Sequence, residues 1–373
     1  NRVEGPAAGT DSVLLAISAG TAWTATANAP WLHLAMSGGF GPGVVPFACD
    51  TNPGATRSGT LTIAGQTLTV VQAGASWSAA NLVATLVSAG LSSPAGVAVD
   101  RVGNVYIADK AHNALVKWNA ADGSVTNLVA SGLTAPNGVA VDVFGNVYIA
   151  DTGNNAVKEW TAADGSVSTL VSTGLNAPAG LALDGSGSVY VADTQNNAIQ
   201  KWDAVSGSVA TLVSGLNAPG GVAVDAAGNV YIADTGSGAI REWNAVDGSV
   251  TALVSTGLNA PAGVAVDTGG NVYIADTGNG AIKEWNAASG TVSVLLSTGL
   301  NSPAGVAVDG SGSVYLADLG NNAIKEIPRA FVDTTARTEP LLSGMERLRV
   351  VLPAAQALSG ALAPASDQSW LTI

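Results

Sequence analysis

Residues 136–142 read Pro-Asn-Gly-Val-Ala-Val-Asp, and residues 147–151 read Val-Tyr-Ile-Ala-Asp. Both patterns recur six times along the chain. The first, Pro-x-Gly-(Val/Leu)-Ala-(Val/Leu)-Asp, ends at Asp100, Asp142, Asp184, Asp225, Asp267 and Asp309. The second, Val-Tyr-(Ile/Val/Leu)-Ala-Asp, ends at Asp109, Asp151, Asp193, Asp234, Asp276 and Asp318. Successive copies of the first pattern lie 42, 42, 41, 42 and 42 residues apart, so one repeated unit organises the chain.

Each unit predicts four short strands. In the second copy they cover 138–142, 147–150, 156–160 and 166–171, separated by turns rich in glycine and asparagine. These residues accept the positive φ angles that hairpin turns require. The first strand is continuously apolar, which is typical of a sheet covered on both faces. Four strands in every 42 residues, repeated six times, predict a six-bladed β-propeller.

The strand count also predicts how the ring closes. A fourth strand follows its own unit only five times, because Pro328 succeeds the last third strand and no further copy comes after it. Residues 82–87 precede the first unit and look like the fourth strands found elsewhere. We expect 82–87 to complete the last blade, which removes two free sheet edges.

The repeats over 82–328 resemble NHL repeats, and the loop Asp-Thr-Gly-Asn-Asn before a strand carries this resemblance. The resemblance implies a six-bladed propeller. Where that family usually has Arg or His after the loop, this chain has Ala114, Ala156, Ala198, Ala239, Ala281 and Ala323. The basic side chains support RNA binding in some relatives, so their loss argues against that function here.

Composition narrows the function further. Acidic residues outnumber basic ones 27 to 14 in 373 residues, and no cluster of Lys or Arg exists. Binding to a phosphate backbone needs a basic face, so nucleic acid and anionic membrane surfaces are unsuitable partners. Polar residues interrupt the uncharged stretch 58–99, so no membrane span is predicted. Cys49 stands alone and is interpreted as a small buried residue.

The first 75 residues have a different pattern and predict a β-sandwich. The expected strands include Val13–Ile17, Ala22–Ala25, Trp31–Leu34, Val44–Phe47, Thr60–Ile63 and Leu68–Val71. The segment resembles a BACON domain, a module often linked to carbohydrate or mucin binding. The resemblance rests on Trp23, the Trp31-Leu32 pair, Asn52, Arg57, the stretch 59–63 and the closing Val71-Gln72.

The predicted organisation is therefore a BACON-like sandwich over 1–75, a propeller over 76–330 and a β tail over 331–373. In the tail, 369–373 echoes 30–34 and 348–352 echoes 13–17, as expected for the first half of a second BACON-like domain. Either the chain is cut from a longer protein, which we favour, or another chain supplies the missing strands and builds a fibre. The N-terminus has no basic-then-apolar leader, so an exported protein would be present here in its mature form or as an excised fragment.

An enzyme on this ring would have to place unlike groups on different blades. The Pro-x-Gly loops carry Ala95, Asn137, Ala179, Gly220, Ala262 and Ala304, of which only Asn137 has a polar side chain. The aspartates that end the second strands, Asp109, Asp151, Asp193, Asp234, Asp276 and Asp318, are interpreted as turn formers, with calcium binding as the alternative.

The departures from the repeat define a candidate asymmetric binding patch at the propeller mouth. Its members are Lys110, His112, Asn137, Gln195 and Leu319. The Lys110/His112 pair could transfer protons, but a single loop histidine is usually only solvated. The tryptophans that end the third strands are expected to pack between blades rather than to stack on sugars.

These observations lead to an expectation of a non-enzymatic, extracellular or cell-surface protein for recognition or scaffolding, with no catalytic residue, no cofactor and no metal. Its expected partners are a protein or glycan at the cell surface, or further copies of the chain joined into a filament through the C-terminal tail. The alternative is a lyase or hydrolase acting at the channel mouth, because propellers that resemble streptogramin lyases and lactonases share this architecture.

Overall fold

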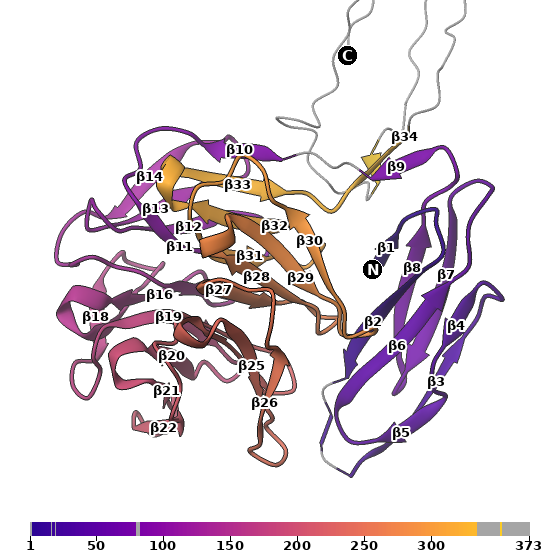
Figure 1. The fold of residues 1–373 in the computed structure, drawn as a ribbon, viewed down its shortest axis with the longest axis horizontal. Helices are drawn as coiled ribbons and strands as arrows, with labels where there is room; N and C mark the ends of the chain where they lie inside the picture. Colours follow the sequence, from indigo (N-terminus) through magenta and orange to yellow (C-terminus); the bar gives the residue numbers. More distant parts are fainter. Residues whose placement is uncertain (1, 16, 19, 80–82, 334–350, 353–373) are drawn as a thin grey trace, which may run out of the picture.

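The computed structural model describes residues 2–15, 17–18, 20–79, 83–333 and 351–352, and these are almost entirely β-structure. Six sheets of four strands form a ring, and the N-terminal strands form two further sheets beside it (Figure 1). The predicted all-β class is confirmed. No helix in these described segments is long and apolar enough to cross a membrane.

The six four-stranded sheets follow the repeat. Their first strands are β11 (Pro94–Val99), β15 (Val139–Val141), β19 (Pro178–Leu183), β23 (Gly221–Val224), β27 (Pro261–Val266) and β31 (Pro303–Val308). Their second strands are β12 (Val105–Asp109), β16 (Val147–Asp151), β20 (Val189–Asp193), β24 (Val230–Asp234), β28 (Val272–Asp276) and β32 (Val314–Asp318). Their third strands are β13 (Ala114–Trp118), β17 (Ala156–Trp160), β21 (Ala198–Trp202), β25 (Ala239–Trp243), β29 (Ala281–Trp285) and β33 (Ala323–Ile327).

The fourth strands of the first five sheets are β14 (Val125–Val129), β18 (Val167–Val171), β22 (Val209–Val213), β26 (Val250–Val254) and β30 (Val292–Leu296). Short 3-10 turns follow five of the second strands. They are η1 (Thr152–Asn154), η2 (Thr194–Asn196), η3 (Thr235–Ser237), η4 (Thr277–Asn279) and η5 (Leu319–Asn321). Each turn ends on an Asn or Gly in the left-handed conformation, which explains the Asn- and Gly-rich loops of the repeat.

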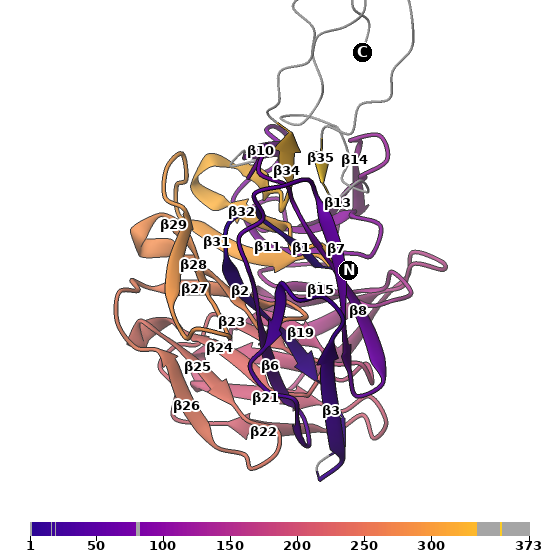
Figure 2. The same ribbon diagram turned by 90° about the vertical axis from the view of Figure 1, so that its right-hand side faces the viewer.

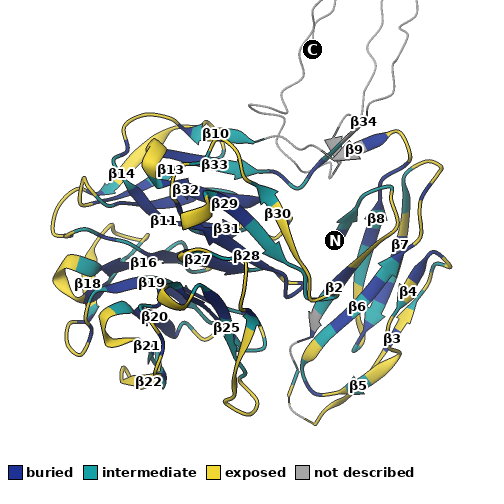
Figure 3. Ribbon diagram, viewed as in Figure 1, coloured by how far each residue is buried: buried dark blue, intermediate teal, exposed yellow. Residues whose placement is uncertain are grey.

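Neighbouring sheets bury one another's faces. Tyr106 and Leu115 of the first sheet pack in one cluster with Val147 and Ile149 of the second, and Trp160 covers the edge of that cluster. Second strands are buried at every residue, whereas turns and outer strands are exposed (Figure 3). Packing on both faces is the reason for the continuously apolar strands. The tryptophan that ends five of the six third strands thus packs between blades, and Ile327 takes its place in β33.

The ring closes with a strand from the start of the propeller. Strand β10 (Ala84–Val87) pairs antiparallel with β33, with Ala84 opposite Glu326 and Val87 opposite Ile324. The apolar cluster at this junction joins Val105 of the first sheet to Tyr315 of the last. The expected closure by 82–87 is confirmed for the part of that segment that the structure describes.

At the centre of the ring the first strands approach so closely that only glycine fits. A Cβ on Gly138 would lie 2.2 Å from the carbonyl oxygen of Ala179 in the next sheet. A Cβ on Gly263 would lie 2.3 Å from the carbonyl oxygen of Ala304. The same close approach is found at Gly96, Gly180, Gly221 and Gly305. The glycine of each Pro-x-Gly motif is therefore required by contact between strand backbones.

The N-terminal strands form a five-stranded and a three-stranded sheet around Val45, Phe47 and Leu61. The five-stranded sheet contains β1 (Arg2–Glu4), β8 (Gln66–Gln72), β7 (Arg57–Ile63), β3 (Ala22–Ala27) and β5 (Gly38–Phe40). The three-stranded sheet contains β2 (Gly9–Leu15), β6 (Gly43–Cys49) and β4 (Leu32–Leu34). The six strands expected from the sequence are present, and β1 and β5 are additional. Strand β1 is short and pairs in parallel with β8. Its partner therefore lies at the other end of the N-terminal segment.

Three residues of the BACON-like pattern form a polar network at one end of these sheets. Arg57 Nε donates to Gln72 Oε1 at 2.9 Å, and Gln72 Nε2 donates to the Asp50 carbonyl oxygen at 2.8 Å. Asn52 Nδ2 donates to the carbonyl oxygens of Ala55 and Ala73, both at 2.9 Å. These side chains satisfy backbone carbonyls where the chain turns, so their role is structural.

A buried polar cluster joins the N-terminal sheets to the propeller turn between β27 and β28. Ser12 Oγ donates to the Gly269 carbonyl oxygen at 2.6 Å, and Arg2 Nη1 lies 3.5 Å from Asp267 Oδ2. Arg2 Nε also lies 3.6 Å from Asp11 Oδ2. Figures 1 and 2 show β2 beside this edge of the ring. Nothing in the repeat indicates this contact.

A small third sheet lies between the two parts. Its strands are β9 (Trp77–Ala79), β34 (Phe331–Asp333) and β35 (Val351–Leu352). Phe331 packs with Trp77 and Val3. Apart from this short β35 pairing, the predicted half-domain in the C-terminal tail lies outside the described residues.

Candidate functional site

A cavity of about 270 Å³ opens at the centre of the ring, on the side where the second strands end. Most of its wall is the backbone and small side chains of the six first strands. Lys110, Asn137, Thr277 and Leu319 also line it, and Lys110 is the one charged residue among the described residues of the lining. Three of the five predicted mouth residues thus share one cavity. His112 and Gln195 are not part of its lining.

The position after each second strand is occupied by threonine in four sheets, where it links neighbouring blades. Thr152 Oγ1 donates to the Pro178 carbonyl oxygen at 2.7 Å, and Thr277 Oγ1 donates to that of Pro303 at 2.7 Å. Thr194 and Thr235 make the same bond to Pro219 and Pro261. Lys110 and Leu319 replace this threonine in the first and last sheets, so the ring departs from its symmetry at two adjacent blades.

The aspartates that end the second strands are buried and organise the loops. Asp151 Oδ1 accepts the backbone N–H of Thr134 at 2.6 Å. Its Oδ2 accepts the Asn154 amide at 2.7 Å and lies 2.7 Å from Lys158 Nζ. Equivalent cations contact Asp234, Asp276 and Asp318, and Gln200 contacts Asp193. These carboxylates therefore hold loops in place.

The same aspartate in the first sheet has a different partner. Asp109 Oδ2 lies 2.7 Å from His112 Nδ1, and Asp109 Oδ1 accepts the Ser92 N–H at 2.8 Å. The cation found seven residues later in most other sheets is replaced here by Val116, which is buried. The Asp109 side chain is 2 % exposed and that of His112 is 55 % exposed. This hairpin presents to solvent an imidazole that is held by a buried carboxylate.

His112 stands out in the sequence, whereas the accompanying change at Val116 was not predicted. Comparison of the third strands would have revealed it, because the other five copies have Lys158, Gln200, Arg241, Lys283 and Lys325 at that position. The two changes belong together. Without a cation, the buried Asp109 carboxylate has the imidazole as its partner, and the imidazole is held by one nitrogen while the other, Nε2, is left for a ligand.

The aspartates considered for calcium do not form a cation site. In the described part of the chain, no three His, Cys, Asp or Glu side chains come together in a way that could hold a metal ion. The carboxylate oxygens already accept hydrogen bonds from their own loops, as at Asp151 and Asp276. These aspartates therefore already have partners within their own loops.

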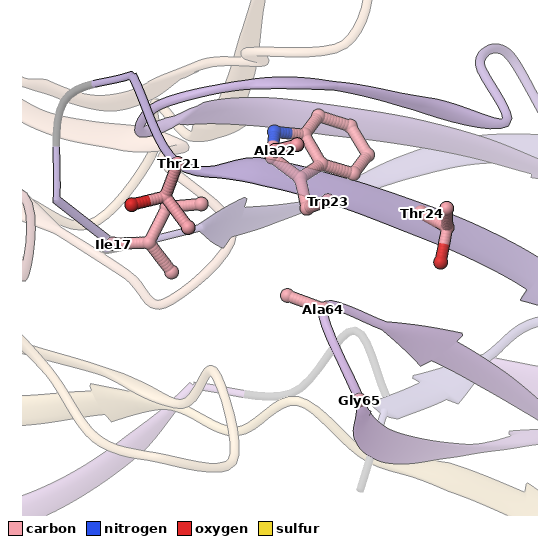
Figure 4. A pocket seen from close by; sticks show the side chains of 7 residues that line it. All are labelled: Ile17, Thr21, Ala22, Trp23, Thr24, Ala64 and Gly65. Carbon is pink, nitrogen blue, oxygen red and sulfur yellow. The ribbon is translucent and has the colours of Figure 1, made fainter.

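A second cavity, of about 350 Å³, lies in the N-terminal sheets and is lined by Ile17, Thr21, Ala22, Trp23, Thr24, Ala64 and Gly65. Figure 4 shows the Trp23 indole turned away from the turn at Ala64 and Gly65. Trp23 is 9 % exposed, and its Nε1 donates to the Gly41 carbonyl oxygen at 3.1 Å. Its ring is thus part of the core, as expected.

The sequence model described as SMP-30/Gluconolactonase/LRE-like region matches residues 63–262, which is more than half of the chain. The chain belongs to the SMP-30/gluconolactonase/LRE-like family. The BACON model, described as an N-terminal binding domain, matches residues 21–73, and the NHL repeat model matches 258–285 and 300–327. No curated protein matches the sequence.

Solved structures similar to this SMP-30/gluconolactonase/LRE-like propeller share its fold at low identity. One is a protein of unknown function from Bacteroides thetaiotaomicron, with 17 % identity, TM-score 0.58, and coverage of 85 % of this chain and 90 % of that one. Another is a gluconolactonase from Xanthomonas campestris, with 19 % identity, TM-score 0.58, and coverage of 66 % and 89 %. A third is a catalytically inactive histidine-to-alanine variant of virginiamycin B lyase from Staphylococcus aureus, with 13 % identity, TM-score 0.51, and coverage of 86 % and 98 %.

The expectation of a non-enzymatic protein is wrong. Membership of the SMP-30/gluconolactonase/LRE-like family points to an enzymatic propeller. The prediction of a non-enzymatic protein rested on the low charge and the regular repeats. Both are properties of the blades and do not report on a site at the channel mouth. A few unlike side chains on one blade are enough for chemistry, and composition does not record them.

Proposed function

We propose that this protein opens small cyclic esters by general-base catalysis at the mouth of the propeller channel. The observation that carries this proposal is the His112–Asp109 pair, with 2.7 Å between His112 Nδ1 and Asp109 Oδ2. In four of the other five sheets the equivalent aspartate contacts a lysine or arginine instead. A buried carboxylate that orients an exposed imidazole is the arrangement that activates water or a carbon acid.

In the proposed hydrolysis, the His112 Nδ1–H donates a hydrogen bond to Asp109 Oδ2, so that the proton stays on Nδ1 and Nε2 carries the lone pair. Nε2 takes a proton from water as the water oxygen attacks the ester carbonyl. The bond from that carbon to the ring oxygen then breaks, and the imidazolium returns its proton to the leaving oxygen. The product is a hydroxy acid, and the base is regenerated.

The cavity supplies the binding part of this site. His112 belongs to the same loop as Lys110, which lines the cavity, but its own ring lies outside the lining. The reacting bond is therefore placed at the rim, while the rest of the substrate enters the cavity. The half-buried Asn137 offers an amide to an ester oxygen. Ring opening by elimination would use the same base on a C–H bond, and an unsaturated product would distinguish that reaction.

The other parts of the chain complete this proposal. The family description of the BACON match supports a binding role for residues 1–75, which we place beside a propeller over 76–330. We further propose that the enzyme works outside the cell, where such a binding module would keep it close to a protein or glycan at the cell surface.

The test is a His112→Asn substitution, which installs the asparagine that most other copies have at this position. We expect lactone hydrolysis, followed in a pH-stat over a panel of five- and six-membered lactones, to fall by about 10²–10⁴-fold. The thermal midpoint should stay unchanged, because an amide can still donate to Asp109 as Asn154 does to Asp151.

The matched control is His33→Asn, since His33 Nε2 also lies 3.0 Å from a carboxylate, that of Asp50, but in the N-terminal sheets. This variant should keep full activity. Equal turnover by the wild type and His112→Asn would refute the role of His112. Absence of turnover on every lactone and of any unsaturated product would refute the proposed function.

A further inference from the structure

Lys110 is a cation in the mouth cavity that makes no ion pair with any described residue. The other lysines are engaged. Lys158, Lys283 and Lys325 contact buried aspartates at 2.6–2.7 Å. Lys201 lies 3.4 Å from Asp184, and Lys117 lies over the ring of Tyr106. The Lys110 ammonium thus remains available at a site where every other described lining residue is uncharged.

This lysine replaces a residue that stabilises the fold. In the next four sheets a threonine at the equivalent position bonds to the neighbouring blade at 2.7–2.8 Å. A lysine cannot make the same short bond from its β-carbon. Positions where a repeat abandons its own stabilising residue are expected to be functional sites.

Asp109, which precedes Lys110 in the sequence, makes no ion pair with it and is paired with His112. Both oxygens of Asp109 are engaged, one by the Ser92 N–H and the other by His112, and its side chain is 2 % exposed. Among the described residues, the remaining lining side chains are aliphatic or carry the uncharged polar groups of Asn137 and Thr277. Lys110 therefore supplies the only charge among the described lining side chains, in a chain whose net charge is −13.

We propose that the substrate of this site carries a carboxylate, which Lys110 binds inside the cavity while the ester bond lies at the rim near His112. This inference rests on the proposed ring-opening function and adds the substrate class. One ammonium without an arginine or second lysine beside it suits a monoanion better than a phosphate dianion. A cavity of about 270 Å³ accommodates a single substituted ring.

The experiment compares a lactone that bears a free carboxylate with its uncharged methyl ester. The variants are Lys110→Thr, which installs the threonine of the next four blades, and Lys110→Arg. We expect the wild type to prefer the carboxylate, and Lys110→Thr to reduce kcat/KM for it at least about tenfold more than for the methyl ester. Lys110→Arg should keep most of the preference. Rising ionic strength should weaken the preference in the wild type and in Lys110→Arg, but not in Lys110→Thr.

The control is Lys117→Thr, because Lys117 lies on the adjacent strand outside the cavity and should leave the preference intact. If Lys110→Thr changes the hydrolysis rates of both lactones equally, the carboxylate inference is overturned and the proposed function still stands. Should neither lactone react, titration of the hydroxy diacid product, followed by NMR, tests the inference independently. If the product binds the wild type and Lys110→Thr abolishes that binding, the carboxylate inference is supported. If the product does not bind, or binds the wild type and Lys110→Thr equally, the inference is refuted.

Discussion

Replacing Gly138 with alanine is expected to destabilise the propeller by about 3–5 kcal/mol, enough to lower its thermal midpoint by roughly 10 °C. The new Cβ would lie 2.2 Å from the Ala179 carbonyl oxygen and 2.9 Å from the Gly180 Cα. Both atoms are backbone, so no side-chain rotation relieves the overlap and a whole first strand has to move. Differential scanning calorimetry of the purified variant measures the change.

Gly185→Ala is the matched control. Gly185 lies in the turn after β19, and a Cβ there meets nothing within 4 Å. This variant should be neutral or stabilise the protein by about 0.4–1 kcal/mol, because alanine restricts the unfolded chain. Similar midpoints for Gly138→Ala and Gly185→Ala would show that the first strands have room to separate. That result would contradict the close backbone contact described between first strands at the ring centre.

The second large effect concerns pH and the contact between the N-terminal sheets and the propeller. Burial raises the pKa of Glu4 to about 8 from 4.5, with Asp11 adding to the rise and Arg329 and Arg2 opposing it. Glu4 Oε1 lies 3.6 Å from Arg329 Nη2, which also lies 3.8 Å from Asp11 Oδ2. Neither of these carboxylate oxygens accepts a hydrogen bond from the described residues. Ionising both carboxyl groups in this buried place is unfavourable.

The direction of this pH effect on stability follows from the number of protons bound by the folded and unfolded chains. Between pH 4.5 and about 8 the unfolded chain has lost the Glu4 proton and the folded chain retains it, so stability falls as the pH rises. At about 1.4 kcal/mol per pH unit, the decrease over this window reaches at most about 5 kcal/mol. We expect the free energy of unfolding, measured in urea at pH 5, 6, 7 and 8, to show this decrease. The protection of backbone amides in β1 and β8 against hydrogen exchange should fall over the same pH range.

Glu4→Gln should flatten this dependence, because a neutral amide replaces the protonated acid. The control is Asp122→Asn, which removes the same charge from an exposed turn. Hydrogen bonds from Ser124 lower the pKa of Asp122, so that residue contributes only in more acidic solution. Wild-type and Glu4→Gln curves that fall in parallel from pH 5 to 8 would exclude Glu4 as the titrating group.

Much of the fold follows from short-range patterns. Each apolar run and each turn at Asn155 or Gly238 is encoded within a few residues, and repetition shows that neighbouring sheets must cover one another. Strands β1 and β5 escaped prediction because each has three residues with a single apolar side chain, whereas the equally short β4 has the alternating Leu32 and Leu34. The pairing of β1 with β8 additionally joins residues about seventy positions apart.

The candidate site was predictable only where it departs from the repeat. Comparison of equivalent positions singled out Lys110, Asn137 and Leu319, and the ring brings these three to one cavity. The same comparison selected Gln195, which is exposed and outside the lining. A departure in sequence shows that a position has lost its common role, but it does not show which way the side chain points.

The amino-acid sequence by itself determined the all-β class, the repeating blade and the strand that closes the ring, because these depend on alternation, turn residues and count. The tertiary structure alone decided that Asp109 pairs with His112, that Lys110 stands unpaired at the mouth, and that Arg2, Glu4 and Asp11 meet the propeller at Asp267 and Arg329. The physical reason is that charge pairing and burial depend on distances between atoms, and folding sets those distances between residues that are remote in the chain.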